Sequence, residues 1–228
     1  MKRVLGVDAC KAGWVGVLLD SDRLEIWVAG TIDALVAQAE LTGPLATVAI
    51  DMPIGLPDKG PRSADLLARA AIGPLTSSVF TTPVRAALLA PTHPEAVVVN
   101  REHAGQGLSV QAYGLRVKLL EIDRWVRKAT MQVVEVHPEV SFAYLAGRPL
   151  TVRKSTWAGA ERRRALLQDA GIHLAGELGL SGLAVGVDDV LDAGAAAWSA
   201  RRVAAGEAAS LPNPPETFAD GWPSAIWA

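Results

Sequence analysis

Four short acidic motifs lie far apart in this chain of 228 residues, each where an apolar segment ends or a helix begins. A carboxylate at the end of a buried strand is costly to desolvate unless a positive group compensates its charge. The repetition of this arrangement favours an α/β fold that gathers the carboxylates around a cation. The motifs are GVDA at 6–9, AIDMPIGLP at 49–57, EVHPE at 135–139 and DDVLDA at 188–193.

The first part of the chain predicts a three-strand meander, a crossover helix and a fourth strand. A right-handed crossover would place the fourth strand parallel to the first and beside it. Asp8 and Asp51, which end these two strands, would then lie together at the carboxyl edge, where α/β sheets bind ligands. The expected strands are residues 4–9, 15–19, 24–29 and 46–50, with a turn at 20–23 and a helix from the cap Thr31 to about residue 41.

Residues 52–111 differ from the rest in their many prolines and loop signals. Short helices are expected at 63–71 and 94–103. Because the apolar residues between them are scattered, we interpret the segment as an insertion or lid within one domain of residues 1–228, and not as a second domain.

The alternation of helix and strand patterns resumes after this insertion. The chain therefore predicts an α/β fold with a mixed five-stranded sheet, a three-strand meander plus parallel strands, flanked by helices. The later elements are expected as helices at 115–128, 157–171 and 188–205, a fifth strand at 131–137, and an irregular proline-rich tail after Leu211.

The amino-acid composition excludes several classes of function and of metal site. The net charge is −2, so a nucleic-acid role would need local basic patches and metal ions. The single cysteine, Cys10, excludes an internal disulfide and a cysteine-cluster metal site. Asp8 and Lys11 interrupt the apolar start too early for a signal peptide, and no apolar run is long enough to span a membrane. We expect a cytoplasmic protein with no membrane partner.

The carboxylates suit a hard cation, which prefers oxygen ligands from separate elements and keeps positions for water and phosphate. Asp189 and Asp192 lie three positions apart on one helix face, and the small residues that follow would let this helix approach the sheet. Two alternatives stay open: strand-end aspartates that bind loop amides, and helix aspartates that complement the dipole, with Asp188 as the N-cap. The predicted ligands of Mg²⁺ or Mn²⁺ are Asp8, Asp51, Asp189 and Asp192.

Glu135 and His137 alternate along the fifth expected strand, so their side chains would share one face. Next to the aspartates, the pair could supply a ligand and a base or proton shuttle, with Glu135 counted among the catalytic carboxylates. The alternative is a solvated sheet edge in which His137 is a turn residue before Pro138.

Basic and hydroxyl side chains near these motifs could bind a substrate phosphate. Residues 116–128 and 148–164 lean basic, and residues 77–85 combine hydroxyls with an arginine. Solvated helix faces and a hydroxyl-rich turn explain the same residues without a ligand. The candidates for substrate contact are Lys11, Ser78, Arg85, Lys118 and His137.

These motifs together resemble a known family over nearly the whole chain. The segments GVDACKAGW, DMPIGLP, SSVF with TTPVR, VEVHPEVSF and DDVLDA resemble domain-of-unknown-function family 429, described as predicted RNase H-like nucleases. The last helix is similar to the paired-aspartate helix of Holliday-junction resolvases of the RuvC type. The resemblance implies an RNase H-like fold with Asp8, Asp51, Asp189 and Asp192 as metal ligands.

Three functions are compatible with these sequence patterns. The first is a metal-dependent nuclease or phosphodiesterase that uses two-metal-type chemistry on a nucleic acid or nucleotide. The second is a non-catalytic RNase H-like binding protein. The third is an actin-like or sugar-kinase-like phosphotransferase, which is disfavoured because the chain has one half of that architecture and lacks the glycine and hydroxyl expected soon after Asp8. Whether the chain forms a homodimer stays open.

Overall fold

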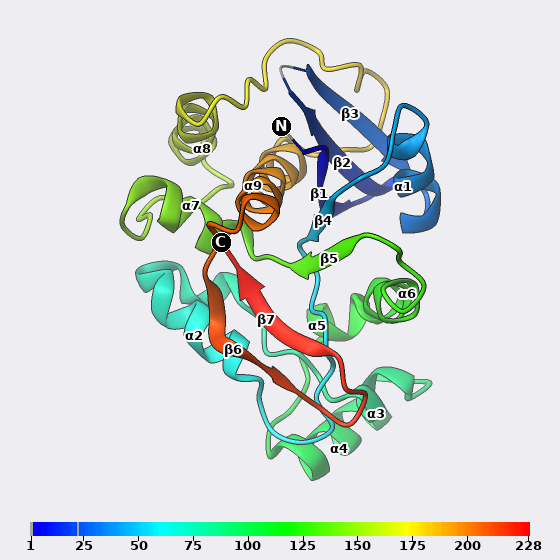
Figure 1. The fold of residues 1–228 in the computed structure, drawn as a ribbon. Coiled ribbons are helices and arrows are strands. Elements are labelled where there is room, and N and C mark those ends of the chain that lie inside the picture. The colour runs from blue at the N-terminus through cyan, green and yellow to red at the C-terminus, as the bar shows by residue number, and fades with distance from the viewer. Residues whose placement is uncertain (1, 22) are drawn as a thin grey trace.

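A mixed sheet lies at the centre of the computed structural model, which describes residues 2–21 and 23–228 (Figure 1). Over these residues the sheet has seven strands in the order β3-β2-β1-β4-β5-β7-β6. The strands are β1 (Val4–Cys10), β2 (Gly13–Asp20), β3 (Arg23–Ala29), β4 (Thr47–Ile50), β5 (Gln132–Glu135), β6 (Ser210–Thr217) and β7 (Pro223–Trp227).

The meander and the parallel strands are where the sequence predicts them. β1 pairs antiparallel with β2, and β2 pairs antiparallel with β3. β4 pairs parallel with β1, with Val7 opposite Ile50, and β5 pairs parallel with β4. This arrangement confirms that the strand before Asp51 lies beside the strand that carries Asp8. Asp22, in the expected turn at 20–23, lies outside the described residues.

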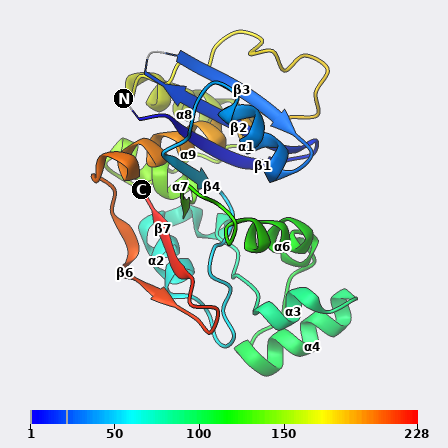
Figure 2. The ribbon, with the colours of Figure 1, turned by 45° about the vertical axis from the view of Figure 1, so that its right-hand side comes forward.

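Helices cover both faces of the sheet (Figures 1 and 2). On one face, Leu5 and Val7 of β1 share a core with Leu35 and Ile122. On the other face, β-strand residues such as Val17 pack with the remaining long helices. The first face is covered by α1 (Ile32–Glu40) and α6 (Arg116–Trp125), and the second by α7 (Pro138–Ala146), α8 (Trp157–Asp169) and α9 (Val187–Ala205).

Helix α9 lies directly against β1 at Gly6. A Cβ atom on Gly6 would lie 1.9 Å from the backbone nitrogen of Ala197 and 2.3 Å from the carbonyl oxygen of Ala193. Strand alternation turns Gly6 and Asp8 to this same face. The run of alanines in α9 therefore does what the sequence predicts, because it allows a close approach beside Asp8.

The predicted five-stranded sheet and irregular tail are wrong. The tail forms the antiparallel pair β6 and β7, and β7 adds to β5 in parallel through Glu135 and Ile226. Prolines hid this hairpin in the sequence, since proline cannot donate to a strand ladder. They are tolerated in β6 because it is the edge strand of the sheet.

The segment at 52–111 is mostly helical, and the expected helix at 63–71 is present. A small apolar cluster, including Val84, Ala96 and Tyr113, forms within it, so its apolar residues are less scattered than the sequence suggests. Its interpretation as an insertion or lid stays a prediction. Its elements are α2 (Ser63–Ala71), the 3₁₀ helix η1 (Gly73–Ser78), α3 (Arg85–Leu89), α4 (His93–Ala104) and α5 (Val110–Gly114).

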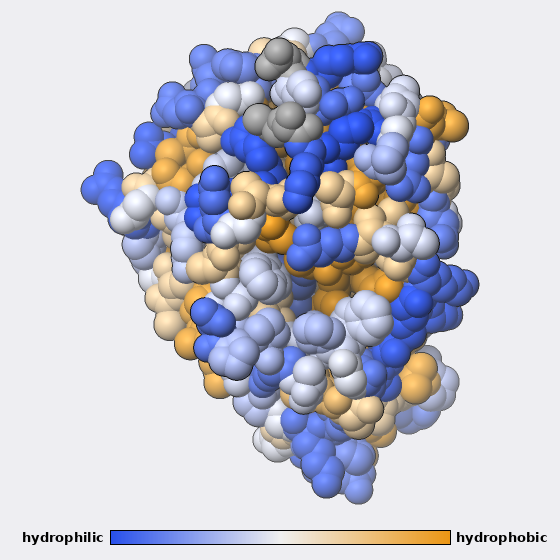
Figure 3. Space-filling view, viewed as in Figure 1, coloured by the Kyte–Doolittle hydropathy of each residue, from blue (hydrophilic) through white to orange (hydrophobic). Residues whose placement is uncertain are grey.

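The surface is mixed in character. On the face shown in Figure 3, apolar residues lie in patches between hydrophilic ones, and hydrophilic residues dominate the lower tip over α4. Within residues 2–21 and 23–228, no helix combines the length and apolar character needed to cross a membrane.

The contact between α9 and β1 gives a stability prediction. Gly6→Ala should lower the free energy of unfolding by about 3 kcal/mol, because the added methyl group overlaps helix backbone that cannot move aside cheaply. Urea unfolding measures this loss. Gly114→Ala, at a helical glycine with open space around it, is the control and should be neutral or slightly stabilising. Equal effects of the two substitutions would contradict the close packing.

Candidate metal centre

Three aspartates from separate elements meet at the carboxyl edge of the parallel strands. Asp8 lies in β1, Asp51 follows β4 directly, and Asp192 lies in the first turns of α9. Each offers a carboxylate oxygen, and these oxygens all lie within 4.8 Å of one another. The β1–β4 pairing brings the first two together, and the packing of α9 on β1 adds the third. This group, Asp8, Asp51 and Asp192, is called the aspartate cluster below.

Burial makes the cluster electrostatically expensive. Asp8 is 7% exposed and Asp192 1% exposed. Burial raises the pKa of Asp51 to about 7 and that of Asp192 to about 7, against the opposing charge of Lys154. Burial also raises the pKa of Asp8 well above its usual range, and the charges of the other two aspartates raise it further. Burial therefore disfavours three negative charges at this site near neutral pH unless positive charge compensates them.

Lys154 supplies one positive charge. Its ammonium donates a hydrogen bond to Oδ2 of Asp192 and lies 3.8 Å from Oδ2 of Asp188. Burial alone would lower the pKa of Lys154, but the nearby carboxylates raise it above its ordinary value. The sequence patterns do not single out this residue. Its only signal was membership of the basic stretch at 148–164, which does not tell which side chain turns inward.

A single ammonium leaves the cluster incompletely paired. Among the described residues, Oδ1 of Asp192 is buried without a hydrogen-bond partner, and so is Nδ1 of His137. A buried, unpaired carboxylate oxygen is costly, so its presence points to a partner beyond the chain's own groups. Three convergent carboxylates with a free oxygen match the ligand chemistry of a hard divalent cation. The aspartate cluster could therefore hold a metal ion.

His137 and Glu139 flank the cluster. Burial lowers the pKa of His137, and Asp192 and Glu139 are among the charges that act on it. Its Nε2 lies 3.4 Å from the carbonyl oxygen of Ser78. Glu139 raises the pKa of Asp51 and Asp192, yet its own carboxylate is bound at 2.6 and 2.7 Å by the buried Arg163.

The sequence did not predict α7, which carries Glu139. The Pro138 that suggested a turn occupies the first position of this helix, where proline is favoured because no partner is needed for its nitrogen. Because α7 begins at Pro138, the strand expected at 131–137 is shorter and forms β5 (Gln132–Glu135). The role of His137 as base or proton shuttle stays a prediction.

Glu135 is not part of the aspartate cluster, although the sequence predicts it as a catalytic residue beside the aspartates. The β4–β5 register sets Glu135 opposite Ile50, and Ile50 faces the core on the α1 and α6 side. Glu135 accepts hydrogen bonds of 2.7 Å from both terminal nitrogens of Arg62 and from the amide of Ile54. Arg62 is buried and also binds Asp65. Glu135 thus joins β5 to the segment that follows β4.

Asp189 is also separated from the cluster. Its carboxylate turns back to accept a 2.8 Å hydrogen bond from the amide of Gly186, the N-cap of α9. This is the helix-start contact of the third helical residue. The prediction of Asp188 as N-cap is therefore wrong by two positions. The geometry supports Asp192, and not Asp189, as the ligand from this helix.

The other candidates for substrate contact lie in varied settings. Lys11 is exposed in the turn between β1 and β2. The Ser78 hydroxyl donates to the carbonyl of Leu75, although its own carbonyl reaches His137. Arg85 is bound by Asp123 and Asp220, and Lys118 donates to the carbonyl of Gly13 while its Nζ lies 4.2 Å from the ring centre of Trp14. Arg85 and Lys118 thus already have intramolecular partners.

The Arg62–Glu135 pair predicts that Glu135 stabilises the fold and is not a catalytic residue. Glu135→Ala should lower the free energy of unfolding by about 3 to 5 kcal/mol, because it leaves the buried Arg62 without its main partner. Glu25→Ala, which breaks the exposed pair with Arg23, is the control and should cost about 1 kcal/mol or less. Chemical denaturation compares them, and a small loss in Glu135→Ala would contradict the structural role.

Comparison with known proteins places the chain in a family without an assigned activity. A family model described as "Protein of unknown function (DUF429)" matches residues 6–217, which contain the whole aspartate cluster. No curated protein and no solved structure matches the chain. The resemblance expected from the motifs is confirmed at the level of the family: the chain belongs to DUF429, a family of unknown function.

Proposed function

We propose that this protein is a divalent-metal-dependent phosphodiesterase of the RNase H-like type, which hydrolyses a phosphodiester bond of a nucleic acid or nucleotide. The observation that carries the proposal is the aspartate cluster, with carboxylate oxygens within 4.8 Å of one another at the carboxyl edge of parallel strands. The order β3-β2-β1-β4-β5 supports it, since it has the meander and parallel strands expected of that fold.

In this proposal the side chains near the cluster have separate roles in metal binding, substrate binding and proton transfer. Asp8, Asp51 and Asp192 would hold Mg²⁺ or Mn²⁺ through oxygens, the ligands that these ions prefer. Such an ion supplies a water of lowered pKa and stabilises charge on the phosphoryl oxygens. Lys154 holds an ammonium at the rim of the cluster, where it can attract an anionic substrate. Burial lowers the pKa of His137, and its unpaired Nδ1 could accept a proton.

A second function is favoured by one contact. The ion pair of Lys154 with Asp192 partly neutralises the cluster without any metal. A permanent lysine counterion would suit a non-catalytic RNase H-like protein that binds its partner without cleaving it. The unpaired Oδ1 of Asp192 favours the metal-dependent function, because a lysine that fully satisfied the site would leave no buried oxygen free.

Cleavage of a nucleic acid tests the roles of the three aspartates. Wild-type protein with Mn²⁺ should cleave labelled single-stranded or duplex nucleic acid. Asp8→Asn, Asp51→Asn and Asp192→Asn should each lose about 100-fold or more in rate, since even outer-shell partners of a metal contribute about 10- to 100-fold. Asp33→Asn, at an exposed position in α1, is the matched control and should keep full activity. Unchanged cleavage by Asp8→Asn would refute the assignment.

The stability of the metal-free protein should depend on pH through Asp51. The folded-state pKa of Asp51 is raised to about 7, so its stabilising protonated form is fully present below pH 4 and is lost as the pH rises through 7. Asp51→Asn removes this loss. In urea unfolding with a chelator, the variant should match wild type near pH 4 and exceed its stability at pH 8. A difference that does not change with pH would contradict the burial of this charge.

A further inference from the structure

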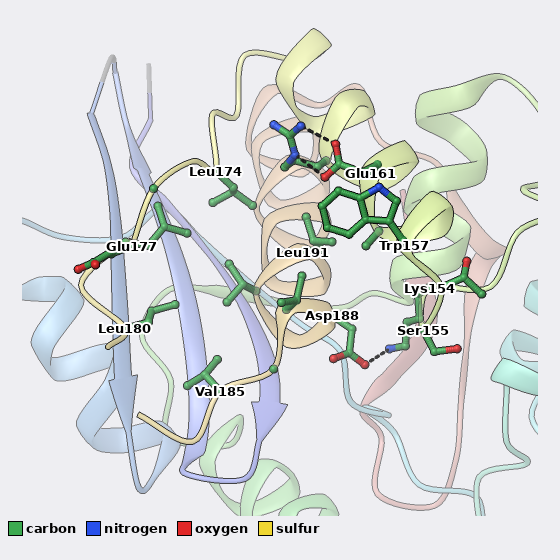
Figure 4. A pocket seen from close by; sticks show the side chains of 18 residues that line it. Lys154, Ser155, Trp157, Glu161, Leu174, Glu177, Leu180, Val185, Asp188 and Leu191 are labelled. Carbon is green, nitrogen blue, oxygen red and sulfur yellow. Dashed lines mark hydrogen bonds and ion pairs between the residues drawn. The ribbon is translucent and has the colours of Figure 1, made fainter. Parts of the chain in front are cut away.

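A pocket of about 740 Å³ lies beside the aspartate cluster, between α8, the start of α9 and the segment that joins them (Figure 4). Its volume is in the range of pockets that bind small molecules. Lys154 and Asp188 line the pocket, and the ammonium of Lys154 also binds Asp192. The pocket is thus connected to the cluster through one side chain. A ligand could occupy the pocket and reach the cluster at the same time.

The walls of this pocket are apolar and include an exposed tryptophan. Leu174, Leu180, Val185 and Leu191 line it, and Trp157 is 82% exposed at the start of α8. Figure 4 shows the indole of Trp157 between Lys154 and Glu161. An exposed aromatic ring beside an apolar hollow is a typical feature of a ligand site.

The charges of the pocket argue against a phosphate inside it. Arg164 is bound to Glu161 at 2.6 Å, and Lys154 is held by Asp192. The remaining charged lining residues, Glu177 and Asp188, are acidic. A phosphate would be repelled here, while a flat, uncharged ring with N–H donors would find apolar walls, an indole and carboxylates that accept hydrogen bonds. A nucleobase has this chemistry.

We propose that this pocket binds one base of the substrate, stacked on Trp157, while the phosphate next to that base lies at the aspartate cluster. This inference rests on the proposed function, because it takes the scissile phosphate to lie at the cluster. A base can enter such a pocket only when it is free of its pairing partner, since its faces and edges are covered in a duplex. The substrate class is therefore a single-stranded or locally unpaired nucleic acid.

The test is binding of a labelled single-stranded oligothymidylate in Ca²⁺, chosen to limit cleavage, measured by fluorescence anisotropy. Trp157→Ala should weaken binding by about 5- to 100-fold, the effect of losing one stacked base, and Trp157→Phe should restore most of it. Leu89→Ala, at an exposed residue of α3 outside the pocket, is the control and should bind like wild type. Oligouridylate of equal length tells whether RNA is held equally well.

An abasic oligonucleotide of the same length separates stacking from backbone binding. Wild type should bind it as weakly as Trp157→Ala binds oligothymidylate, and Trp157→Ala should not weaken it further. Equal binding of oligothymidylate by wild type and Trp157→Ala would overturn the proposal, and so would an equal loss on the abasic strand. Because Trp157 is 82% exposed, thermal unfolding should show that the variant folds normally.

The cleavage and binding assays distinguish an error in the pocket proposal from an error in the proposed function. If only the pocket proposal is wrong, Mn²⁺-dependent cleavage is lost in Asp8→Asn, while Trp157→Ala leaves the KM unchanged. If only the nuclease proposal is wrong, binding still depends on the base and on Trp157, while Mn²⁺ produces no cleavage that Asp8→Asn abolishes.

Discussion

The close packing of α9 on β1 is the constraint on which the rest of the structure depends. Gly6 leaves no room for a side chain between the strand and the helix backbone, so α9 lies where its first turns reach the carboxyl edge of the sheet. Strand alternation puts Asp8 on the same face as Gly6, and the parallel β4 brings Asp51 beside it. The aspartate cluster is thus a consequence of how the core is packed, with no long loop needed to assemble it.

That packing places three carboxylates where burial makes their charges costly. Burial raises the pKa values of all three aspartates, and the charges of neighbouring carboxylates, Glu139 among them, raise them further. The ammonium of Lys154 compensates only part of their charge. By contrast, the buried carboxylates of Glu135 and Glu139 each have an arginine partner. The chain therefore pairs its structural carboxylates fully and leaves the cluster short of positive charge. A divalent cation is the kind of group that could supply the missing positive charge.

Much of this arrangement could be predicted because it follows from periodicity. The meander, the crossover and the alanine-rich helix indicate that Asp8, Asp51 and Asp192 converge. Side-chain partners do not follow from spacing: Asp189 turns back to cap its helix, and Glu135 faces the opposite side of the sheet, where Arg62 binds it. Lys154 lies in an irregular segment, and the prolines of β6 concealed an edge strand. The Glu135–Arg62 pair, the Lys154–Asp192 contact and the β6–β7 pairing depend on contacts between residues distant in the sequence or on edge position, which local sequence patterns do not encode. The Asp189 contact is local, but the two adjacent aspartates leave open which of them caps the helix.

The central claim is that the aspartate cluster binds a divalent cation through Asp192 and not Asp189. Isothermal titration calorimetry of Mn²⁺ into the metal-free protein tests it most directly, with Asp192→Asn and Asp189→Asn as a matched pair from one helix. The structure predicts that wild type and Asp189→Asn bind Mn²⁺ with similar affinity, and that Asp192→Asn loses binding. Binding that survives in Asp192→Asn, or no binding by the wild-type protein, would contradict the account.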